Sequence, residues 1–293
     1  MNSVQSSRKL ILGTVQLGLP YGINNSLGKP DQMEAFKILG KARSYNIEIL
    51  DSADAYGDSL EIIGRYHKEN KQNQFKKVIS KFIHDDTPLT QKVQKTLEGL
   101  AIDRLYVYMY HRYLDYVSGR NHKELIDLKK NNKIEQIGLS VYHLQEFMKA
   151  IDDETISVIQ IPYNPFDASS QKRDLLKRAK QKGKEIHVRS IFLQGLFFKN
   201  PEDLLGNLTE LRNPLHNFHQ IRTDYNLSVM QACLNFALGE NHIDYVLIGV
   251  ETELQLDQNI DSILPVFPED AMERLSKLQV ENTSLLNPSN WKL

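Results

Sequence analysis

Four polar residues of types that suit proton transfer each lie at or just beyond the end of an apolar run: Asp51, Tyr56, Lys81 and His111. A free phenol and a free ammonium both have a pKa of about 10, so neither is poised for proton transfer at pH 7. A neighbouring ammonium lowers the pKa of a phenol, and a carboxylate keeps that ammonium charged and in place. These types predict a phenol that protonates a carbonyl oxygen as hydride reaches the carbon, with a neutral histidine donating to the same oxygen.

These side chains can meet only if their apolar runs are neighbouring strands. Residues 47–51, 78–81 and 106–111 each read as a short buried strand, and an amphipathic helical pattern separates each from the next. Consecutive parallel strands of an α/β barrel end on one face, where such barrels keep their chemistry. We therefore expect the four residues to lie together at the C-terminal face of a barrel.

The rest of the chain repeats the same alternation of strand and helix. Further strands are expected at 10–13, 137–140, 158–161, 186–192 and 245–250, and helices at 31–45, 60–67, 90–100, 125–130, 144–151 and 170–182. Eight such units predict a single (β/α)₈ TIM barrel that spans residues 1–293 as one domain. The long segment 194–227 interrupts the rhythm, and we expect it to lie over the C-terminal face as a loop that shapes the pocket.

Composition supports one large core and excludes several classes of partner. The chain has 293 residues, of which 41% are hydrophobic and 25% charged, and a barrel typically needs about 250. The net charge of −1 provides no excess of positive charge that would attract nucleic acid or an anionic membrane. The single cysteine, Cys233, excludes an internal disulfide and fits a reducing compartment, so we predict a cytoplasmic protein with Cys233 in the core of a helix.

Three further features of the sequence resemble functional signals only weakly, and we assign no function to them. No apolar run approaches the ~20 residues of a membrane span, and Gln16 interrupts the run after Arg8 and Lys9 that otherwise resembles a signal peptide. His216 and His219 have the spacing of metal ligands on a helix, but no further ligand lies near them in sequence, so we predict no metal site. The glycines at 13–18 match neither a P-loop nor a dinucleotide fingerprint.

The motif DSADAYG at 51–57, with Glu61 and Gly64, then Lys81 and the run 100–111, resembles the Asp/Tyr/Lys/His tetrad of the aldo/keto reductases. The resemblance extends from residue 13 to about residue 259. It implies a barrel enzyme that reduces an aldehyde or ketone with NADPH or NADH. In that family pattern Tyr56 is the general acid, Lys81 and Asp51 tune it, and His111 places the carbonyl.

The resemblance also implies a set of cofactor-binding residues. Ser140 and Gln160 stand where the family holds the nicotinamide carboxamide, residues 190–195 resemble the loop around the pyrophosphate, and 249–259 resemble the adenosine end. The implied residues are Gly13, Thr14, Ser140, Gln160, Arg189, Ser190, Phe192, Gln194, Gly195, Gly249, Val250, Gln255, Gln258 and Asn259.

The chain departs from the family pattern at the nicotinamide. Val141 replaces the usual Asn after the fifth strand, which removes one amide contact. Arg189 replaces the aromatic residue that stacks on nicotinamide, and its guanidinium adds positive charge beside the oxidised ring.

A second departure concerns the 2′-phosphate of NADPH. Gly249, Val250 and Gln255 stand where Lys, Ser and Arg would grip that phosphate, and Glu251 adds a negative charge. These residues predict a weak preference for either cofactor, or a tilt to NADH. A basic residue from another loop, Lys199 or Arg222, could still provide a phosphate anchor.

The substrate and two other functions remain open. The motifs GTVQLG at 13–18 and YGI at 21–23 resemble those of bacterial reductases linked to surface sugars, so a sugar-derived carbonyl compound is one expectation. Fold alone does not fix function, so the chain could instead be a non-catalytic nucleotide-binding barrel that acts as a sensor or subunit. A barrel lyase or isomerase that uses Lys81 as a Schiff base is disfavoured, because the predicted Asp51 partner keeps Lys81 charged.

Overall fold

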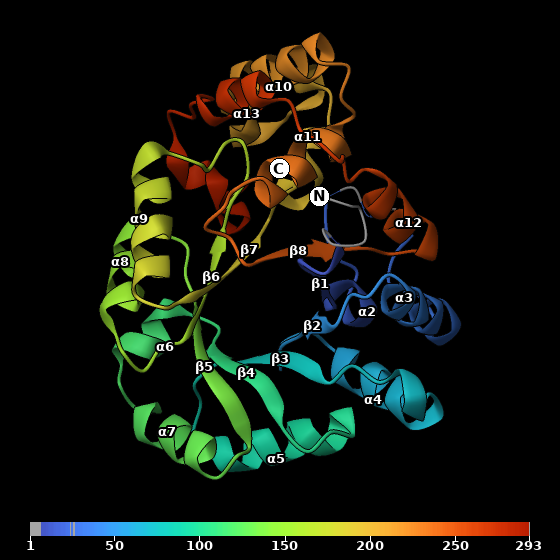
Figure 1. Ribbon diagram of the computed structural model, residues 1–293, viewed down its shortest axis with the longest axis vertical. Helices are drawn as coiled ribbons and strands as arrows, with labels where there is room; N and C mark the ends of the chain where they lie inside the picture. The colour runs from blue at the N-terminus through green and yellow to red at the C-terminus, as the bar shows by residue number, and fades with distance from the viewer. Residues whose placement is uncertain (1–6, 24, 26, 293) are drawn as a thin grey trace.

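The computed structural model describes residues 7–23, 25 and 27–292, and in this part of the chain the strands form a closed barrel in sequential order, β1 to β8 (Figure 1). Every pair is parallel, and β1 closes the barrel by pairing with both β2 and β8. The strands are β1 Leu10–Gly13, β2 Ile49–Asp51, β3 Lys77–Phe82, β4 Leu105–Tyr110, β5 Ile134–Ser140, β6 Val158–Pro162, β7 Glu185–Arg189 and β8 Tyr245–Gly249. The predicted (β/α)₈ barrel is confirmed.

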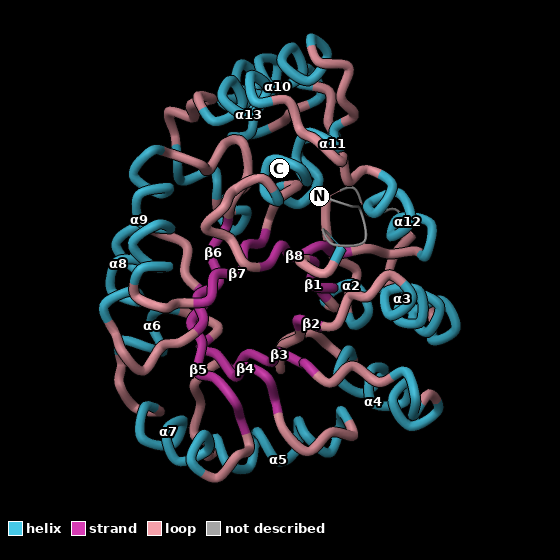
Figure 2. Tube along the Cα trace, viewed as in Figure 1, coloured by secondary structure: helices cyan, strands magenta, loops and turns pink. Residues whose placement is uncertain are grey.

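The strands are apolar runs because both of their faces are covered. All six residues of β4 are buried, which is typical of parallel strands between a barrel interior and a helical layer. A small cluster that includes Ile11, Ile49, Ile79 and Met109 is separate from the larger cluster of the chain, to which most helices contribute. Figure 2 shows the strands as an inner ring and the helices as an outer one.

The helices follow the strands in sequence. They are α2 Val15–Gly18, α3 Gln32–Ser44, α4 Ser59–Glu69, α5 Leu89–Leu100, α6 Tyr113–Val117, α7 His122–Lys130, α8 Leu144–Asp152, α9 Ser170–Gln181, α10 Arg212–Asp224, α11 Val229–Leu238, α12 Glu253–Asp261 and α13 Glu269–Ser276. Asp31 caps the N-terminus of α3, since its carboxylate accepts from the Glu34 amide at 2.8 Å. Cys233 is buried in α11, as expected.

The segment predicted as a long loop at 194–227 is largely helical. It contains short 3₁₀ turns, η2 Leu193–Phe198, η3 Pro201–Asp203 and η4 Gly206–Leu211, and then α10. Helix α10 forms because Leu215, Phe218 and Ile221 recur at helical spacing and are all buried. Pro214 does not prevent it, because the N–H groups of the first turn have no intrahelical partner. Figure 1 shows α10 and α13 side by side at the top of the molecule, with α11 between them and β8.

Several strand ends differ from the expected ones. Strand β7 ends at Arg189 rather than at residue 192, because Ser190 adopts a φ of 59° that no extended strand allows. Strand β3 continues one residue past Lys81, to Phe82. As a consequence Lys81 lies inside the sheet rather than at its end.

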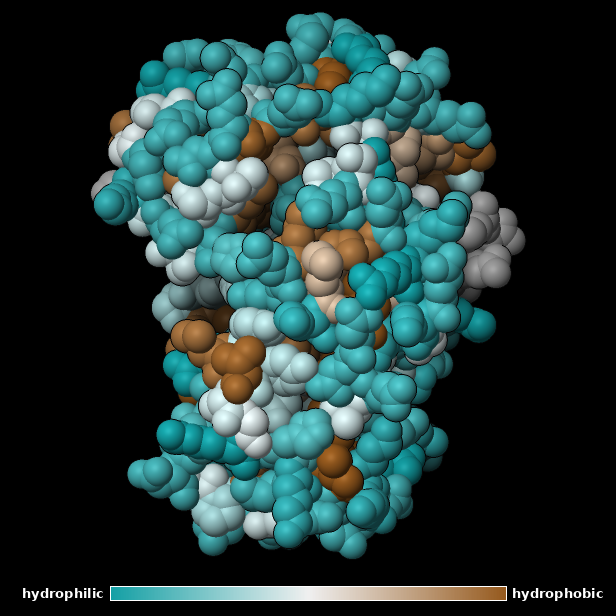
Figure 3. Space-filling model, turned by 90° about the vertical axis from the view of Figure 1, so that its left-hand side faces the viewer, coloured by the Kyte–Doolittle hydropathy of each residue, from teal (hydrophilic) through white to brown (hydrophobic). Residues whose placement is uncertain are grey.

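The face of the molecule in Figure 3 is mostly hydrophilic with separate apolar areas. No helix in the described ranges is long and apolar enough to span a bilayer. Large exposed apolar side chains include Leu27, Leu114, Leu205 and Val266.

Candidate active site

Three neighbouring strands bring the four sequence-predicted catalytic residues together. Asp51 is the last residue of β2, Lys81 lies near the end of β3, and His111 follows β4 directly. The Lys81 ammonium donates to the Asp51 carboxylate, and to the Tyr56 hydroxyl at 3.4 Å. One buried cation therefore contacts both a carboxylate and a phenol.

The environment of Lys81 keeps its side chain charged. Its side chain is 1% exposed, and burial by itself opposes the charged form. The Asp51 carboxylate and the Tyr56 hydroxyl outweigh burial and raise the pKa of Lys81 above its ordinary value. The ammonium also lies 5.0 Å from the centre of the Tyr56 ring, so it is in place to stabilise a phenolate.

His111 lies beside Tyr56 and is neutral at physiological pH. The two rings meet edge to face, with centroids 5.9 Å apart and an interplanar angle of 84°. Burial, and then the positive charge of Lys81, lower the pKa of His111 to about 4. Its Nδ1 is buried and has no hydrogen-bond partner within the described chain. A neutral imidazole carries one N–H donor and one acceptor, so His111 can donate a hydrogen bond to a carbonyl oxygen without adding a charge.

Gln160, expected at the nicotinamide, is also tied to the catalytic residues. Its amide Nε2 donates to the Asp51 Oδ2 at 2.8 Å, from β6 across the barrel. The two carboxylate oxygens of Asp51 therefore hold different partners, Lys81 on one and Gln160 on the other. Sequence reasoning missed this bond because the two residues are far apart in the chain.

A cavity of about 780 Å³ opens above these residues, within the size range of small-molecule sites. It is lined by Asp51, Tyr56 and His111 and by all the predicted cofactor-binding residues except Val250. Val250 is 2% exposed and packs in the hydrophobic core instead. Lys81 is not in the lining either, since it lies buried under Tyr56.

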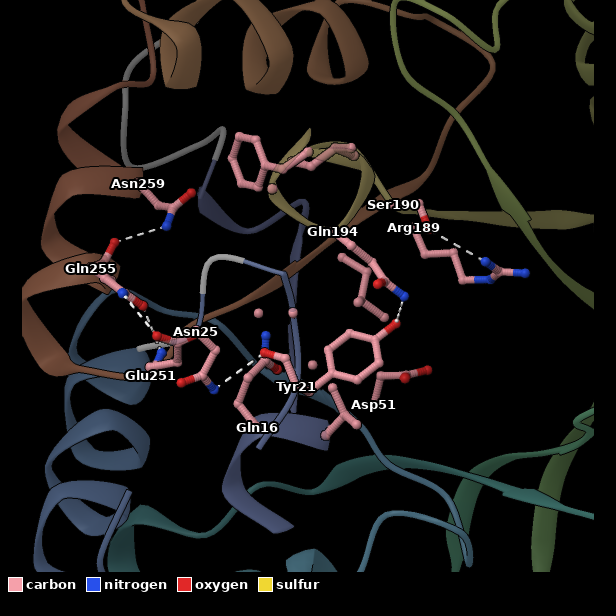
Figure 4. A pocket seen from close by; sticks show the side chains of 18 of the residues that line it. Gln16, Tyr21, Asn25, Asp51, Arg189, Ser190, Gln194, Glu251, Gln255 and Asn259 are labelled. Atoms are coloured by element: carbon pink, nitrogen blue, oxygen red, sulfur yellow. Dashed lines mark hydrogen bonds between the residues drawn. The ribbon is translucent and has the colours of Figure 1, made fainter. Parts of the chain in front are cut away.

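The cavity has two distinct ends. Figure 4 shows Arg189, Asp51 and Tyr21 at one end, and Glu251, Gln255 and Asn259 at the other. Sequence reasoning did not assign several further lining residues, among them Gln16, Tyr21, Asn25, Tyr142, Phe198 and Met230. Tyr142 could have been found, since it comes shortly after the end of β5.

The turn η2 and residues 21–23 meet at the cavity. The Gln194 side chain donates to the Tyr21 hydroxyl at 2.7 Å, and the Ile23 amide donates to the Gln194 carbonyl at 3.3 Å. Gln194 and Gly195 both have positive φ, 51° and 94°, which turns this segment toward residues 21–23.

The opposite end is polar and contains a carboxylate. The Gln255 Oε1 accepts from the Glu251 amide at 2.7 Å, and its Nε2 lies 3.4 Å from the Glu251 carboxylate. Asn259 donates to the Gln255 carbonyl at 2.8 Å, while its own Oδ1 is buried without a partner among the described residues. This acceptor belongs to the segment 249–259, which the sequence assigned to the adenosine end of the cofactor.

The residues proposed as alternative anchors or ligands lie in different places. Lys199 lines the cavity, whereas Arg222 is absent from its lining and donates to His219 at 3.0 Å. His216 contacts Glu202 and His219 contacts the Lys199 carbonyl, so the two histidines have separate partners.

A sequence model of the aldo/keto reductase family matches residues 9–280, which is most of the chain. The chain belongs to the aldo/keto reductase family. Members of this family are oxidoreductases that act on small carbonyl compounds with a nicotinamide cofactor.

Individual relatives are distant in sequence. The chain is 24% identical over 301 aligned positions to aldo-keto reductase str7 of Strobilurus tenacellus, which covers 92% of this chain and 88% of that one. Among solved structures, aldo-keto reductase AKR11C1 from Bacillus halodurans in its holo form is similar with a TM-score of 0.72 and 17% identity, over 94% of both chains. An aldo-keto reductase from Pseudomonas aeruginosa has a TM-score of 0.63 and 20% identity, over 91% of this chain and 90% of that one. These structural likenesses support the fold.

Proposed function

We propose that this aldo/keto reductase reduces an aldehyde or ketone with NADH or NADPH, that residues 1–293 act as one catalytic domain, and that Tyr56 is the general acid. The observation that carries this proposal is the buried Lys81 ammonium, which contacts both the Asp51 carboxylate and the Tyr56 hydroxyl. Tyr56 itself lines the cavity, so its hydroxyl can reach a substrate there.

The cavity fits a nicotinamide dinucleotide. It runs from the catalytic residues to α12 and is lined by both apolar and polar side chains, among them Asn259, whose buried Oδ1 has no partner among the described residues. Gln255, Gln258 and Asn259 would hold the adenosine end, and Ser140 the nicotinamide end, with Ser190, Phe192, Gln194 and Gly195 between them. The bound cofactor supplies the hydride.

The side chains of the protein would then carry out the proton transfer. Tyr56 would donate its proton to the carbonyl oxygen as negative charge develops there, and the Lys81 ammonium would stabilise the phenolate that remains. Asp51 would keep Lys81 charged and oriented, and Gln160 would keep Asp51 oriented. His111, neutral above a pKa of about 4, would donate a hydrogen bond that positions the same oxygen.

We also propose a tilt to NADH. Glu251 lines the adenosine end of the cavity, and a carboxylate there repels the 2′-phosphate of NADPH but can accept a hydrogen bond from a ribose hydroxyl. The Gln255 amide is engaged with Glu251 and offers no positive charge. Lys199 is the cavity cation that could oppose this tilt.

The test is an assay of cofactor oxidation with a panel of aldehydes and ketones, sugar-derived ones included. Tyr56→Phe keeps the ring but removes the proposed proton donor, so turnover should fall by roughly 10²-fold or more. The dissociation constants of NADH and NADPH, from cofactor fluorescence, should change little. A Tyr56→Phe protein with wild-type turnover would contradict the proposed mechanism.

Two other outcomes would favour the alternative functions. Tight cofactor binding with no turnover of any carbonyl compound would favour a nucleotide-binding sensor or subunit. Borohydride trapping of a carbonyl substrate on Lys81 would favour Schiff-base chemistry. The contact of Lys81 with Asp51 argues against the second outcome, because an ammonium is not a nucleophile.

A further inference from the structure

Arg189 places a positive charge at the catalytic end of the cavity. It is the last residue of β7, it is half-buried, and it lines the cavity with Tyr56 and His111. Its charge is close enough to act on both His111 and Tyr21. Figure 4 shows its guanidinium at the end of the cavity where Asp51 and Tyr21 lie, away from Glu251 and Asn259.

No side chain of the described part of the structure forms an ion pair with Arg189. Asp51 lines the same end of the cavity, and Asp167 is close enough for the charge of Arg189 to act on it, but each carboxylate is paired with a buried lysine, Asp51 with Lys81 and Asp167 with Lys172. Both pairs are neutral as units, so neither cancels the guanidinium. The catalytic end therefore carries one uncompensated positive charge.

The guanidinium is fixed in place by neutral groups. Its Nη2 donates to the Val141 carbonyl at 3.2 Å, and its Nη1 lies 3.4 Å from the Ser190 hydroxyl. Its central carbon lies 4.0 Å from the centre of the Tyr142 ring. A guanidinium has five N–H groups in a rigid fork, so these contacts leave donors free. Because the side chain is already ordered, a ligand that pairs with it does not have to immobilise it.

We infer that Arg189 forms a subsite for a carboxylate on the carbonyl substrate, so that the preferred substrates are oxo acids rather than neutral aldehydes or ketones. This inference rests on the proposed carbonyl reduction at Tyr56. A planar carboxylate matches the fork of a guanidinium with two parallel hydrogen bonds. The phenol rings of Tyr142 and Tyr21, which also line the cavity, add flat walls and further hydroxyl groups beside it.

The test compares carbonyl compounds that carry a carboxylate with their neutral methyl esters. Rates are measured with 4-carboxybenzaldehyde against methyl 4-formylbenzoate, and with succinic semialdehyde against its methyl ester. In the wild-type protein kcat/KM should favour at least one acid over its ester by roughly tenfold to a hundredfold, the usual range for a charge-assisted pair. Arg189→Gln should remove most of that ratio, and Arg189→Lys should retain part of it because the charge remains without the fork.

A matched control separates the subsite from general positive charge. Arg112 follows His111, also acts on its charge, and does not line the cavity. Arg112→Gln should therefore leave the acid-to-ester ratio unchanged. A second comparison measures kcat/KM for glyceraldehyde 3-phosphate and for glyceraldehyde. If the preference for the phosphate exceeds the preference for the carboxylates, the Arg189 subsite binds a phosphate and the inference of a carboxylate subsite is overturned.

A binding measurement makes the result independent of turnover. Benzoate titrated calorimetrically into the protein, with and without cofactor, should bind at least tenfold more weakly to Arg189→Gln than to wild type. An unchanged benzoate affinity together with an unchanged acid-to-ester ratio would overturn the inference. If Arg189→Gln instead weakens NADH binding and lowers both rates equally, Arg189 serves the nicotinamide and the subsite does not exist. Absence of all carbonyl reduction with normal benzoate binding would contradict the proposed function and leave the anion site standing.

Discussion

The backbone of Gly18 presses directly against the backbone of Tyr56. A Cβ built on Gly18 would lie 1.8 Å from the Tyr56 carbonyl oxygen, closer than any real contact. The neighbouring Gly57 makes a similar close contact with Gly18. Gly57 has a φ of 54°, and a Cβ built on it would lie 2.4 Å from the Gly18 carbonyl oxygen. The end of α2 therefore fixes the position of the loop that contains Tyr56, the proposed proton donor.

Gly18→Ala should consequently damage catalysis from a position that need not touch the substrate. The new methyl group must push the Tyr56 backbone away, and a displacement of about 1 Å at a reacting group can cost roughly 10²-fold in rate. Single-turnover rates should fall while the dissociation constant for NADH changes much less. The control is Gly99→Ala in α5, where an added Cβ meets nothing within 4 Å. That variant should keep its rate and gain roughly 0.5–1 kcal/mol of stability.

Lys81 and Asp51 should behave as a unit in both activity and stability. Lys81→Met leaves the Asp51 carboxylate buried, with Gln160 as its one remaining side-chain partner among the described residues, and removal of one member of a buried pair costs roughly 3–5 kcal/mol. Asp51→Asn should cost less activity than Lys81→Met, because the ammonium beside Tyr56 remains. The double variant should lose far less stability and activity than the sum of the single losses. Strict additivity in urea unfolding and in kcat would show that the two residues do not share a task.

His111 should make stability depend on pH in a definite direction. Its pKa is about 4 in the folded protein, against an ordinary value of 6.5, so the unfolded chain takes up a proton first as pH falls. The free energy of unfolding should therefore decrease between about pH 6.5 and pH 4, by roughly 3 kcal/mol at most from this group. The full contribution is present above pH 6.5.

The variant His111→Gln isolates this contribution, because it keeps a donor but cannot titrate. The difference in unfolding free energy between the wild type and His111→Gln should change across pH 4–6.5 and level off outside that window. A constant difference would mean that His111 does not remain neutral in the folded protein. Turnover of the wild type should not show a His111 titration above pH 5.

The sequence predicted the barrel and the meeting of Asp51, Lys81 and His111 because parallel strands impose both. A residue at the end of a buried apolar run must lie at one face of the sheet, whatever the intervening helices do. The expected roles of these residues, by contrast, came from the family resemblance and stay predictions.

Other features of the site depend on contacts that no local pattern encodes. The bond from Gln160 to Asp51 crosses the barrel, and the contact of the Arg189 guanidinium with the Tyr142 ring joins the end of β7 to the segment after β5. The close approach of Gly18 and Tyr56 gives no signal in either segment alone. The helix at 212–224 could have been predicted from the sequence, since Leu215 and Phe218 have helical spacing. The prolines and Gly206 of this segment favoured a loop instead.

If Glu251 and Gln255 determine the preference between NADH and NADPH, substitution of these two residues should shift that preference toward NADPH. The wild type should bind NADH at least as tightly as NADPH at low salt, because Glu251 lines the cavity at the adenosine end and Gln255 is neutral. Glu251→Ser with Gln255→Arg removes the repulsion and adds a donor fork, which is worth roughly 1.5–3 kcal/mol for a charge-assisted hydrogen bond to phosphate. The ratio of the two dissociation constants should then move toward NADPH by roughly tenfold or more.

The control for that experiment lies on the same helix. Glu253 is in the first turn of α12, pairs with Lys41 and does not line the cavity, so Glu253→Gln should leave the ratio unchanged. If the wild type instead binds NADPH a hundredfold tighter than NADH, a phosphate anchor must exist, and Lys199 is the cation of the lining that could provide it. Lys199→Met would then abolish the preference for NADPH, because a methionine of similar length keeps the packing and removes only the charge. Loss of that preference in Lys199→Met, with no effect of Glu251→Ser, would move the determinant of cofactor choice from α12 to the segment after η2.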